Sequence, residues 1–151
     1  MSSIARTIEI DVPVTRAYDA WRRIENLPEF IDGVQHVERL DDSRYQLTGD
    51  LGSGRQVWEV RILEEIPDLL LSWESSSRRP GMRTLTFSSD EGMTRLQMVV
   101  EYDPEHVDGR GGDPHAVMAR RVDDELYRFK AYIEAREQGR TSFRTEDAPA
   151  R

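Results

Sequence analysis

Three ionisable side chains, Arg83, Glu64 and His36, occupy positions from which they could act on a bound molecule. Arg83 and Glu64 each lie in a segment that alternates apolar and polar residues, at the parity of the apolar ones. That parity places both on the buried face of a strand, whereas the parity of His36 is ambiguous. A buried charge is costly unless it is paired, so these groups could pair with each other, lie at the rim of a sheet or face a polar ligand. The three alternatives stay open, and the residues are candidates for acid–base catalysis without an assigned role.

The side chains expected beside these groups are mostly aromatic or aliphatic. Alternation places Trp58 and Val60 on the inward face of one segment, and Leu85 and Phe87 on the inward face of another. Aromatic rings and methionine suit a flat or unsaturated apolar ligand, although each residue taken singly could be ordinary core packing. The predicted ligand-binding residues are Phe30, Tyr45, Trp58, Val60, Trp73, Arg83, Leu85, Phe87, Met98, Tyr102, Met118, Val122 and Leu126.

Seven segments with strand periodicity must position these side chains. They cover residues 4–12, 34–41, 43–49, 55–66, 69–75, 82–89 and 93–102. Short turn sequences such as 41–43, 67–68 and 90–92 separate consecutive segments, which indicates antiparallel hairpins. The simplest arrangement of the last six strands is a meander.

Helical periodicity flanks the six consecutive strands. Apolar residues recur at three- and four-residue spacing over 14–24, and Asn26 could cap a short second helix over 27–31. The longest predicted helix is capped by Asp113, and Gly139 is predicted to end it. Its apolar stripe consists of Met118, Val122, Leu126, Phe129 and Ile133.

These elements predict a single α+β domain over residues 1–140, followed by a disordered tail over 141–151 without periodic apolar content. One long helix is available to cover the buried face of a sheet of about seven strands. A twisted sheet that curls around such a helix leaves space between the two. The sequence therefore predicts an internal cavity, with a hydrophobic small molecule as the partner.

Composition excludes several classes of function. The formal net charge of −8 argues against nucleic acid as a partner, because phosphate binding needs a basic patch. With no cysteine and three histidines, the sequence predicts neither a disulfide, nor a metal site, nor a cofactor. It contains no apolar run of the ~20 residues that a membrane span needs, and its first residues do not form a signal peptide. We therefore expect a cytoplasmic protein without membrane insertion, as a monomer or homodimer.

Motifs spread along the chain resemble one known family. They include residues 8–13 (IEIDVP), 25–30 (ENLPEF), 58–59 (WE), 101–104 (EYDP) and 128–130 (RFK). In this order and spacing they resemble the polyketide cyclase/dehydrase branch of the SRPBCC (START-like) superfamily. The resemblance implies a helix-grip fold, in which a curved antiparallel sheet wraps around the C-terminal helix and encloses a deep apolar pocket.

The same resemblance leads to three hypotheses about function. Aromatase/cyclases of this family orient a poly-β-ketone with an inward arginine and a tyrosine, whereas the matching positions here are Glu64 and Val34. One hypothesis is a cyclase/dehydrase that is assisted by Arg83, Glu64 or His36. The alternative is a non-catalytic carrier or sensor of a quinone or lipid, as in coenzyme Q-binding relatives. A third hypothesis is a protein-interaction module, as in cochaperone relatives.

Overall fold

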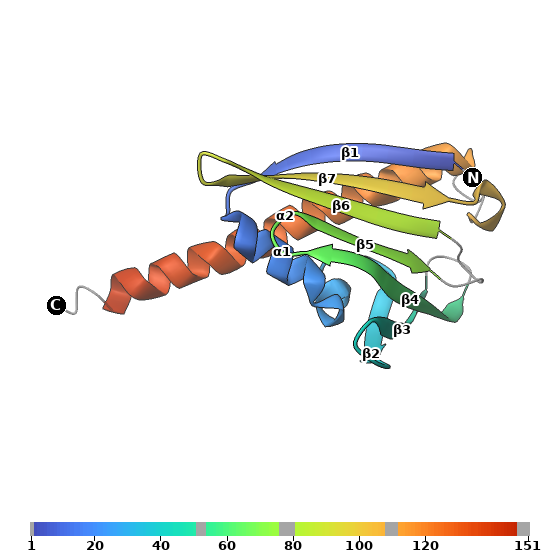
Figure 1. Cartoon of the computed structure of the whole chain (residues 1–151), viewed down its shortest axis with the longest axis horizontal. Helices are drawn as coiled ribbons and strands as arrows, with labels where there is room; N and C mark the ends of the chain where they lie inside the picture. The colour runs from blue at the N-terminus through green and yellow to red at the C-terminus, as the bar shows by residue number, and fades with distance from the viewer. Residues whose placement is uncertain (1, 51–53, 76–80, 108–111, 148–151) are drawn as a thin grey trace.

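The computed structural model describes residues 2–50, 54–75, 81–107 and 112–147 (Figure 1). The elements, with 3-10 helices labelled η, are β1 (Ser2–Ile10), α1 (Val14–Arg22), η1 (Ile24–Glu29), β2 (Val34–Arg39), β3 (Arg44–Asp50), β4 (Arg55–Ile66), β5 (Leu70–Ser75), β6 (Gly81–Asp90), β7 (Met93–Tyr102), η2 (Pro104–His106) and α2 (Pro114–Asp147). This order of elements agrees with the one predicted from the periodicity of the sequence.

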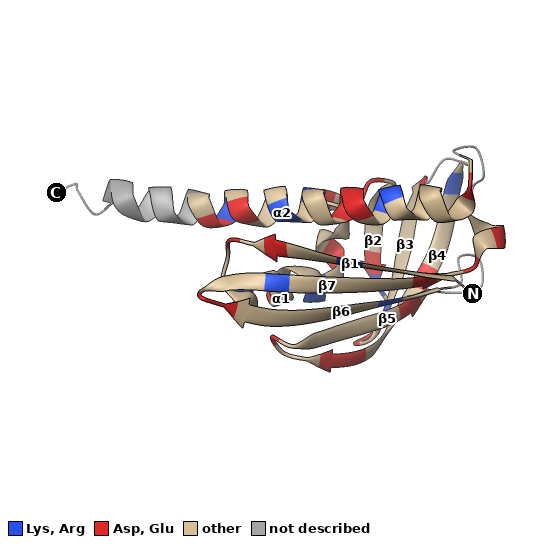
Figure 2. Ribbon diagram, turned by 90° about the horizontal axis from the view of Figure 1, so that it is seen from above, with Lys and Arg blue, Asp and Glu red and all other residues tan. Residues whose placement is uncertain are grey.

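The seven strands form one antiparallel sheet in the order β1-β7-β6-β5-β4-β3-β2. From β2 to β7 each strand pairs with the next one along the chain, and β1 is added beside β7. That last pairing aligns Ile4 with Val100 and Ile8 with Leu96. The sheet curves, and α2 runs along one of its faces (Figures 1 and 2). The predicted helix-grip fold is confirmed.

Helix α2 begins as the sequence predicted. The Asp113 carboxylate accepts a hydrogen bond of 3.1 Å from the backbone N–H of Ala116, which satisfies one of the free donors of the first turn. The apolar stripe is buried at Val122, Leu126 and Phe129, so the helix is held by packing against the sheet. Acidic and basic residues follow one another on the rest of its surface (Figure 2).

Two predicted helix boundaries are wrong. Asn26 lies within η1 rather than at a cap, and its side-chain amide donates to the carbonyl of Ala20 at 3.4 Å. Helix α2 continues past Gly139 to Asp147, so residues 141–147 are helical and not irregular. Glycine in a helix costs ~1 kcal/mol relative to alanine but keeps its N–H, so it weakens a helix without ending it. The domain boundary at residue 140 stays a prediction, and residues 148–151 lie outside the described residues.

An aromatic cluster fills the space between the sheet and the middle of α2. Trp21 of α1 has its ring centroid 4.8 Å from that of Phe30 and 5.0 Å from that of Phe129. Trp73 of β5 adds a fourth ring, 6.0 Å from Trp21. All four residues are buried, and aromatic pairs at such distances stabilise a core beyond their buried area. The cluster leaves the space beside the N-terminal part of α2 unfilled.

Among the described residues, none of the helices combines the length and the apolar character that crossing a bilayer requires.

Candidate functional site

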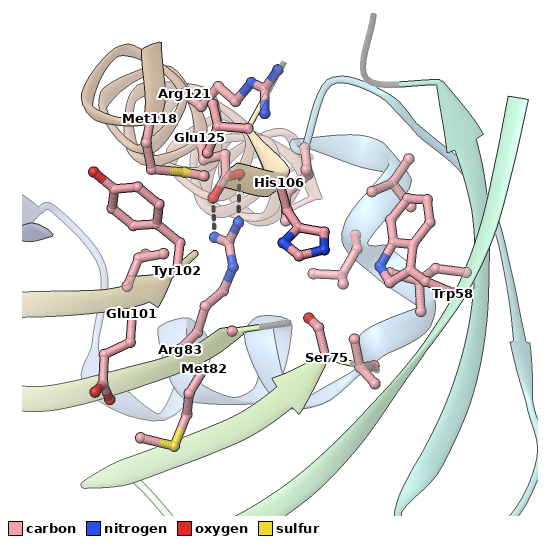
Figure 3. A pocket seen from close by; sticks show the side chains of 18 of the residues that line it. Trp58, Ser75, Met82, Arg83, Glu101, Tyr102, His106, Met118, Arg121 and Glu125 are labelled. Carbon is pink, nitrogen blue, oxygen red and sulfur yellow. Dashed lines mark hydrogen bonds and ion pairs between the residues drawn. The ribbon is translucent and has the colours of Figure 1, made fainter. Parts of the chain in front are cut away.

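A cavity of about 560 Å³ lies between the first turns of α2, the curved sheet and η1 (Figure 3). Strands β3 to β7 all contribute to its wall, because their inward side chains converge on the concave side of the sheet. Val117 and Met118 close it from α2, and Leu27 closes it from η1. Its volume falls within the ~300–1,000 Å³ of typical small-molecule sites.

Most of the cavity wall is apolar. Trp58 of β4 and Trp73 of β5 present indole rings to it, and both residues are buried. Trp58 is the cross-strand partner of Leu47, so the two side chains form one continuous surface. The other aliphatic lining residues are Ile31, Val34, Val60, Val100 and Val107. A wall of this kind favours a ligand with a large apolar or aromatic body.

The polar centre of the cavity is an ion pair between Arg83 of β6 and Glu125 of α2 (Figure 3). Arg83 Nη2 donates to Glu125 Oε1 at 2.9 Å, and Nη1 donates to Oε2, so the contact is bidentate. Glu125 is 6% exposed and the Arg83 side chain 21% exposed, which makes this a largely buried pair. Two parallel charge-assisted bonds fix the orientation of both side chains.

The pair also determines the charge state of Arg83. Burial acts to lower the pKa of the guanidinium, but the attraction and the hydrogen bonds of Glu125 outweigh burial and raise that pKa. Met98 Sδ lies 3.6 Å from Nη1 and offers a weak acceptor on the sheet side. Arg83 therefore remains a cation in the cavity, with its charge matched by one carboxylate.

Two further polar groups lie near the start of α2. His106 of η2 lines the cavity, and its Nδ1 lies 3.0 Å from Asp103 Oδ2. In Figure 3 the imidazole projects into the space between the Arg83–Glu125 pair and Trp58. Tyr102 also lines the cavity, with its hydroxyl 3.0 Å from His115 Nδ1. The part of the chain that the structure describes holds no cluster of three or more side chains suited to bind a metal ion.

The comparison with protein families decides where this chain belongs. Residues 10–129 match the model of the family described as polyketide cyclase/dehydrase and lipid transport. The chain belongs to this family. The motifs that carried the resemblance in the sequence lie within or beside the matched region.

Relatives of the chain fit this family assignment. An uncharacterized 17.2 kDa protein from the melC2–rnhH intergenic region of Streptomyces lincolnensis is 28% identical over 141 residues, which cover 91% of this chain and 93% of that protein. The crystal structure of the Zhui aromatase/cyclase from Streptomyces sp. R1128 is similar with a TM-score of 0.72 at 13% identity, covering 89% of this chain and 94% of that one. A conserved protein from Geobacillus kaustophilus has a TM-score of 0.75 at 11% identity, covering 89% and 96%. At these identities the structures show a shared fold.

The two positions at which this chain departs from the aromatase/cyclase pattern lie in different surroundings. Val34 is buried and lines the cavity, so an apolar side chain stands where the resemblance expects a tyrosine. Glu64 is exposed, although alternation placed it inward with Ile62. The register of β4 on β5 shifts between Ile62 and Glu64, and this bulge turns the glutamate outward.

His36 also lies outside the cavity. It is exposed on β2, directly after a register shift between Val34 and His36. Of the three candidate catalytic residues, Arg83 alone lines the cavity, and the structure brings neither Glu64 nor His36 beside it. A bulge adds one residue to one strand, so alternation counted along a single segment does not reveal it.

The predicted ligand-binding residues divide into two groups. Those that line the cavity are Trp58, Val60, Trp73, Arg83, Tyr102 and Met118. Those that belong to the packed core outside its lining are Phe30, Tyr45, Leu85, Phe87, Met98, Val122 and Leu126. Phe87, for example, packs edge-on against Tyr18 at a centroid distance of 5.4 Å.

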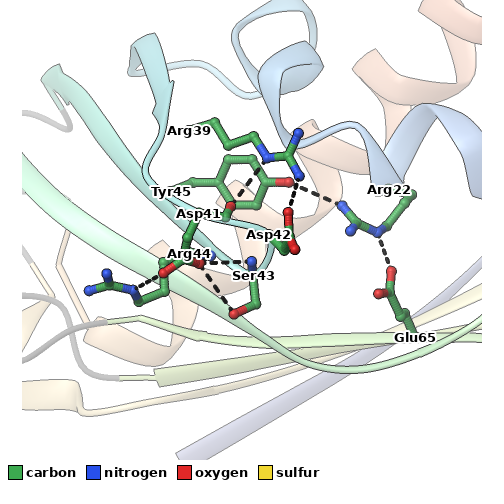
Figure 4. A network of polar contacts seen from close by, with 8 residues as sticks. All are labelled: Arg22, Arg39, Asp41, Asp42, Ser43, Arg44, Tyr45 and Glu65. Atoms are coloured by element: carbon green, nitrogen blue, oxygen red, sulfur yellow. Dashed lines mark hydrogen bonds and ion pairs between the residues drawn. The ribbon is translucent and has the colours of Figure 1, made fainter.

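Tyr45 takes part in a polar network instead (Figure 4). Its hydroxyl accepts a hydrogen bond of 3.2 Å from Arg22 Nη1, and Arg22 Nε also donates to the Glu65 carboxylate. These bonds raise the pKa of Arg22 against the opposing effect of burial. They join α1 to β3 and β4, so the role of Tyr45 visible here is structural.

The sequence reasoning missed Glu125 and His106. Residue 125 follows Val122 by three and precedes Phe129 by four, so its place within the apolar stripe was visible from spacing. A carboxylate at such a position needs a partner, but the partner Arg83 is 42 residues away along the chain. His106 lies three residues after Asp103, a spacing that occurs in many capped turns and does not by itself indicate a site.

Proposed function

We propose that this member of the family binds a hydrophobic, aromatic or polyketide-like small molecule in the cavity. The observation that carries the proposal is the wall itself, in which Trp58 and Trp73 face a volume of about 560 Å³. Indole rings bind flat apolar ligands through large contact areas. The Arg83–Glu125 pair and the His106 imidazole supply the few polar groups that orient a ligand in such sites.

The relatives support a polyketide-like ligand. The Zhui protein is an aromatase/cyclase, and the fold it shares with this chain covers 89% of the chain. Folds of this kind host several functions, so the similarity supports a mode of binding more than a reaction.

Cyclase/dehydrase chemistry is a second candidate function, which His106 favours. When Asp103 accepts the hydrogen bond from Nδ1–H, the Nε2 lone pair is free to accept a proton from a ligand. Removal of a proton from a carbon between two carbonyls gives an enolate, which attacks a further carbonyl carbon. The oxygen of that carbonyl then takes the proton back from the imidazolium. Glu125 is less suited as the base, because both of its oxygens accept hydrogen bonds from Arg83.

Non-catalytic carriage of a quinone or lipid remains the alternative to catalysis. The mutual pairing of Arg83 and Glu125 favours it, since neither group is left free to transfer a proton. Carriage and catalysis share the same binding step and differ only in whether the ligand is changed.

Native mass spectrometry of the freshly purified full chain tests the binding proposal, followed by denaturing extraction of any released molecule. We expect an adduct that is lost on denaturation, or an empty protein that takes up an uncharged aromatic probe such as 2-naphthol with a stoichiometry of one. A protein that neither carries a ligand nor takes up aromatic probes would contradict the proposal. Change of the extracted molecule on incubation with the protein would distinguish catalysis from carriage.

A further inference from the structure

The cation inside the cavity is already neutralised. Both terminal nitrogens of Arg83 donate to Glu125, one at 2.9 Å, and the two residues are largely buried. Each of these nitrogens carries two N–H groups, so a neutral oxygen acceptor could still receive a hydrogen bond from Arg83. A ligand anion would instead have to share the guanidinium with a carboxylate that holds it bidentately.

The charges around the cavity also disfavour an anionic ligand. Its lining contains three arginines and six carboxylates, a formal balance of −3. The carboxylates are Asp32, Asp50, Glu101, Asp103, Asp124 and Glu125. Clefts lined by one sign of charge concentrate molecules of the opposite sign and repel those of the same sign. An anionic ligand is thus disfavoured both at the rim and at the centre.

We infer that the cavity selects uncharged ligands over their carboxylate counterparts, and that Glu125 is the residue that sets this specificity. The inference rests on the proposed function, since it concerns which ligand the same cavity takes. A carboxylate entering the cavity would lose its hydration without gaining an uncompensated cation, and burial of a charge under those conditions is costly. Discrimination of this kind works through the penalty on the wrong ligand rather than through better contacts to the right one.

We expect replacement of Glu125 to reverse the specificity, so that the cavity prefers anionic ligands. In Glu125→Gln the side chain keeps its size but loses its charge, and Arg83 becomes a cation without a carboxylate partner. A ligand carboxylate could then take the place of the missing charge and bond to the guanidinium in the same bidentate manner. The substitution should therefore convert a cavity for neutral molecules into one for anions.

Binding of 2-naphthol and 2-naphthoate at pH 7 and one fixed ionic strength tests the inference by calorimetry on the full chain. The two probes share the ring system and differ in charge. For the unaltered protein we expect 2-naphthol to bind at least about tenfold more tightly. For Glu125→Gln we expect this ratio to disappear or to reverse.

Asp123→Asn is the matched control. Asp123 lies on the same helix and pairs with Arg6 outside the cavity, and its substitution removes the same unit of charge as Glu125→Gln. It should keep the preference of the unaltered protein. If Glu125→Gln does not fold, the double variant Arg83→Gln/Glu125→Gln removes both charges and should still prefer 2-naphthol.

Equal or tighter binding of 2-naphthoate to the unaltered protein would overturn the inference while leaving the proposed function intact. An unchanged probe ratio in Glu125→Gln would remove Glu125 from the role of specificity determinant. Failure of both probes to bind any variant would overturn the proposed function and the inference with it.

Discussion

Trp73 on β5 and Arg83 on β6 are direct partners in the antiparallel register, and both line the cavity. An indole ring and a guanidinium therefore stand side by side on the concave face of the sheet. Because side chains alternate between the two faces, a one-residue slip of this pairing would turn Arg83 outward and leave Glu125 without its partner. The polarity of the cavity thus depends on the pairing of β5 with β6 as much as on the types of residue.

Filling the cavity should prevent ligand binding. Val60→Phe adds a ring at a position that lines the open space, so we expect the protein to fold and its affinity for 2-naphthol to fall at least about tenfold. Calorimetric titration measures the loss, and circular dichroism checks the fold. Val57→Phe is the control, since Val57 lies on the same strand but is 42% exposed. Equal affinity in both variants would show that the ligand binds elsewhere.

Substitution of His106 distinguishes catalysis from carriage. If the protein is a cyclase, His106→Gln should lower turnover of a poly-β-ketone by about 100-fold or more, because loss of a general base removes a contribution of that size. Affinity for 2-naphthol should fall much less than turnover, because His106 is one of many residues that line the cavity. The exposed His36→Gln provides the control in the same reconstituted assay. An unchanged product distribution in His106→Gln would exclude this histidine as the base and favour a carrier.

Breaking the buried ion pair should destabilise the fold. Arg83→Met leaves Glu125 as an unpaired buried charge, and removal of one partner of such a pair costs about 3–5 kcal/mol of unfolding free energy. Urea denaturation measures the difference. The double variant Arg83→Met/Glu125→Leu should recover most of the loss, because an apolar pair can replace a buried salt bridge.

An exposed ion pair provides the comparison for this effect. Arg61 Nε lies 3.1 Å from Glu74 Oε1 on the other face of the sheet, and both side chains are about half exposed. Arg61→Met should therefore cost at most about 1 kcal/mol. A similar cost for the two single substitutions would mean that the Arg83–Glu125 pair is solvated in solution.

The Asp41 carboxyl, in the turn between β2 and β3, should titrate at unusually low pH (Figure 4). Hydrogen bonds from the Arg44 side chain and the Ser43 backbone lower the pKa of Asp41 from 3.8 to about 2. A carboxyl whose pKa is lowered on folding stabilises the folded state above its unfolded pKa. That contribution is lost as the pH falls from about 3.8 towards 2. Carbon-detected NMR of the Asp41 carboxyl measures the midpoint, which Arg44→Gln should move back towards the ordinary value.

Alternation and helical spacing were sufficient to predict the fold but not the site. They placed Trp58, Trp73 and Arg83 on inward faces, since a residue's parity within a regular strand follows from geometry alone. They misplaced Glu64 and left the side of His36 undecided, and a register shift precedes each of these residues. A bulge depends on the register between two paired strands, and alternation within one strand does not predict that register.

The sequence also did not distinguish the residues of the packed core from those that line the cavity. Phe30 and Trp58 are both buried aromatic residues, yet Phe30 belongs to the cluster with Trp21 and Phe129 whereas Trp58 faces open space. Hydrophobicity predicts that such residues leave water, and it does not distinguish contact with other side chains from contact with a void. The difference arises from what fills the space under α2: rings pack against Phe129, whereas the cavity lies beside the earlier residues Val117 and Met118.

The pairing of β1 with β7 has a consequence for synthesis on the ribosome. Ile8 is made well before its partner Leu96 and must wait for it, which at ~5–20 residues per second means a delay of roughly 4–18 s. Throughout that interval the first strand emerges as a free edge, open to pairing with other nascent chains. Arg6 and Glu9 interrupt its apolar residues, and charges of this kind oppose such aggregation. Strand β1 therefore cannot pair until β7 has been made, and its charged residues oppose aggregation during that interval.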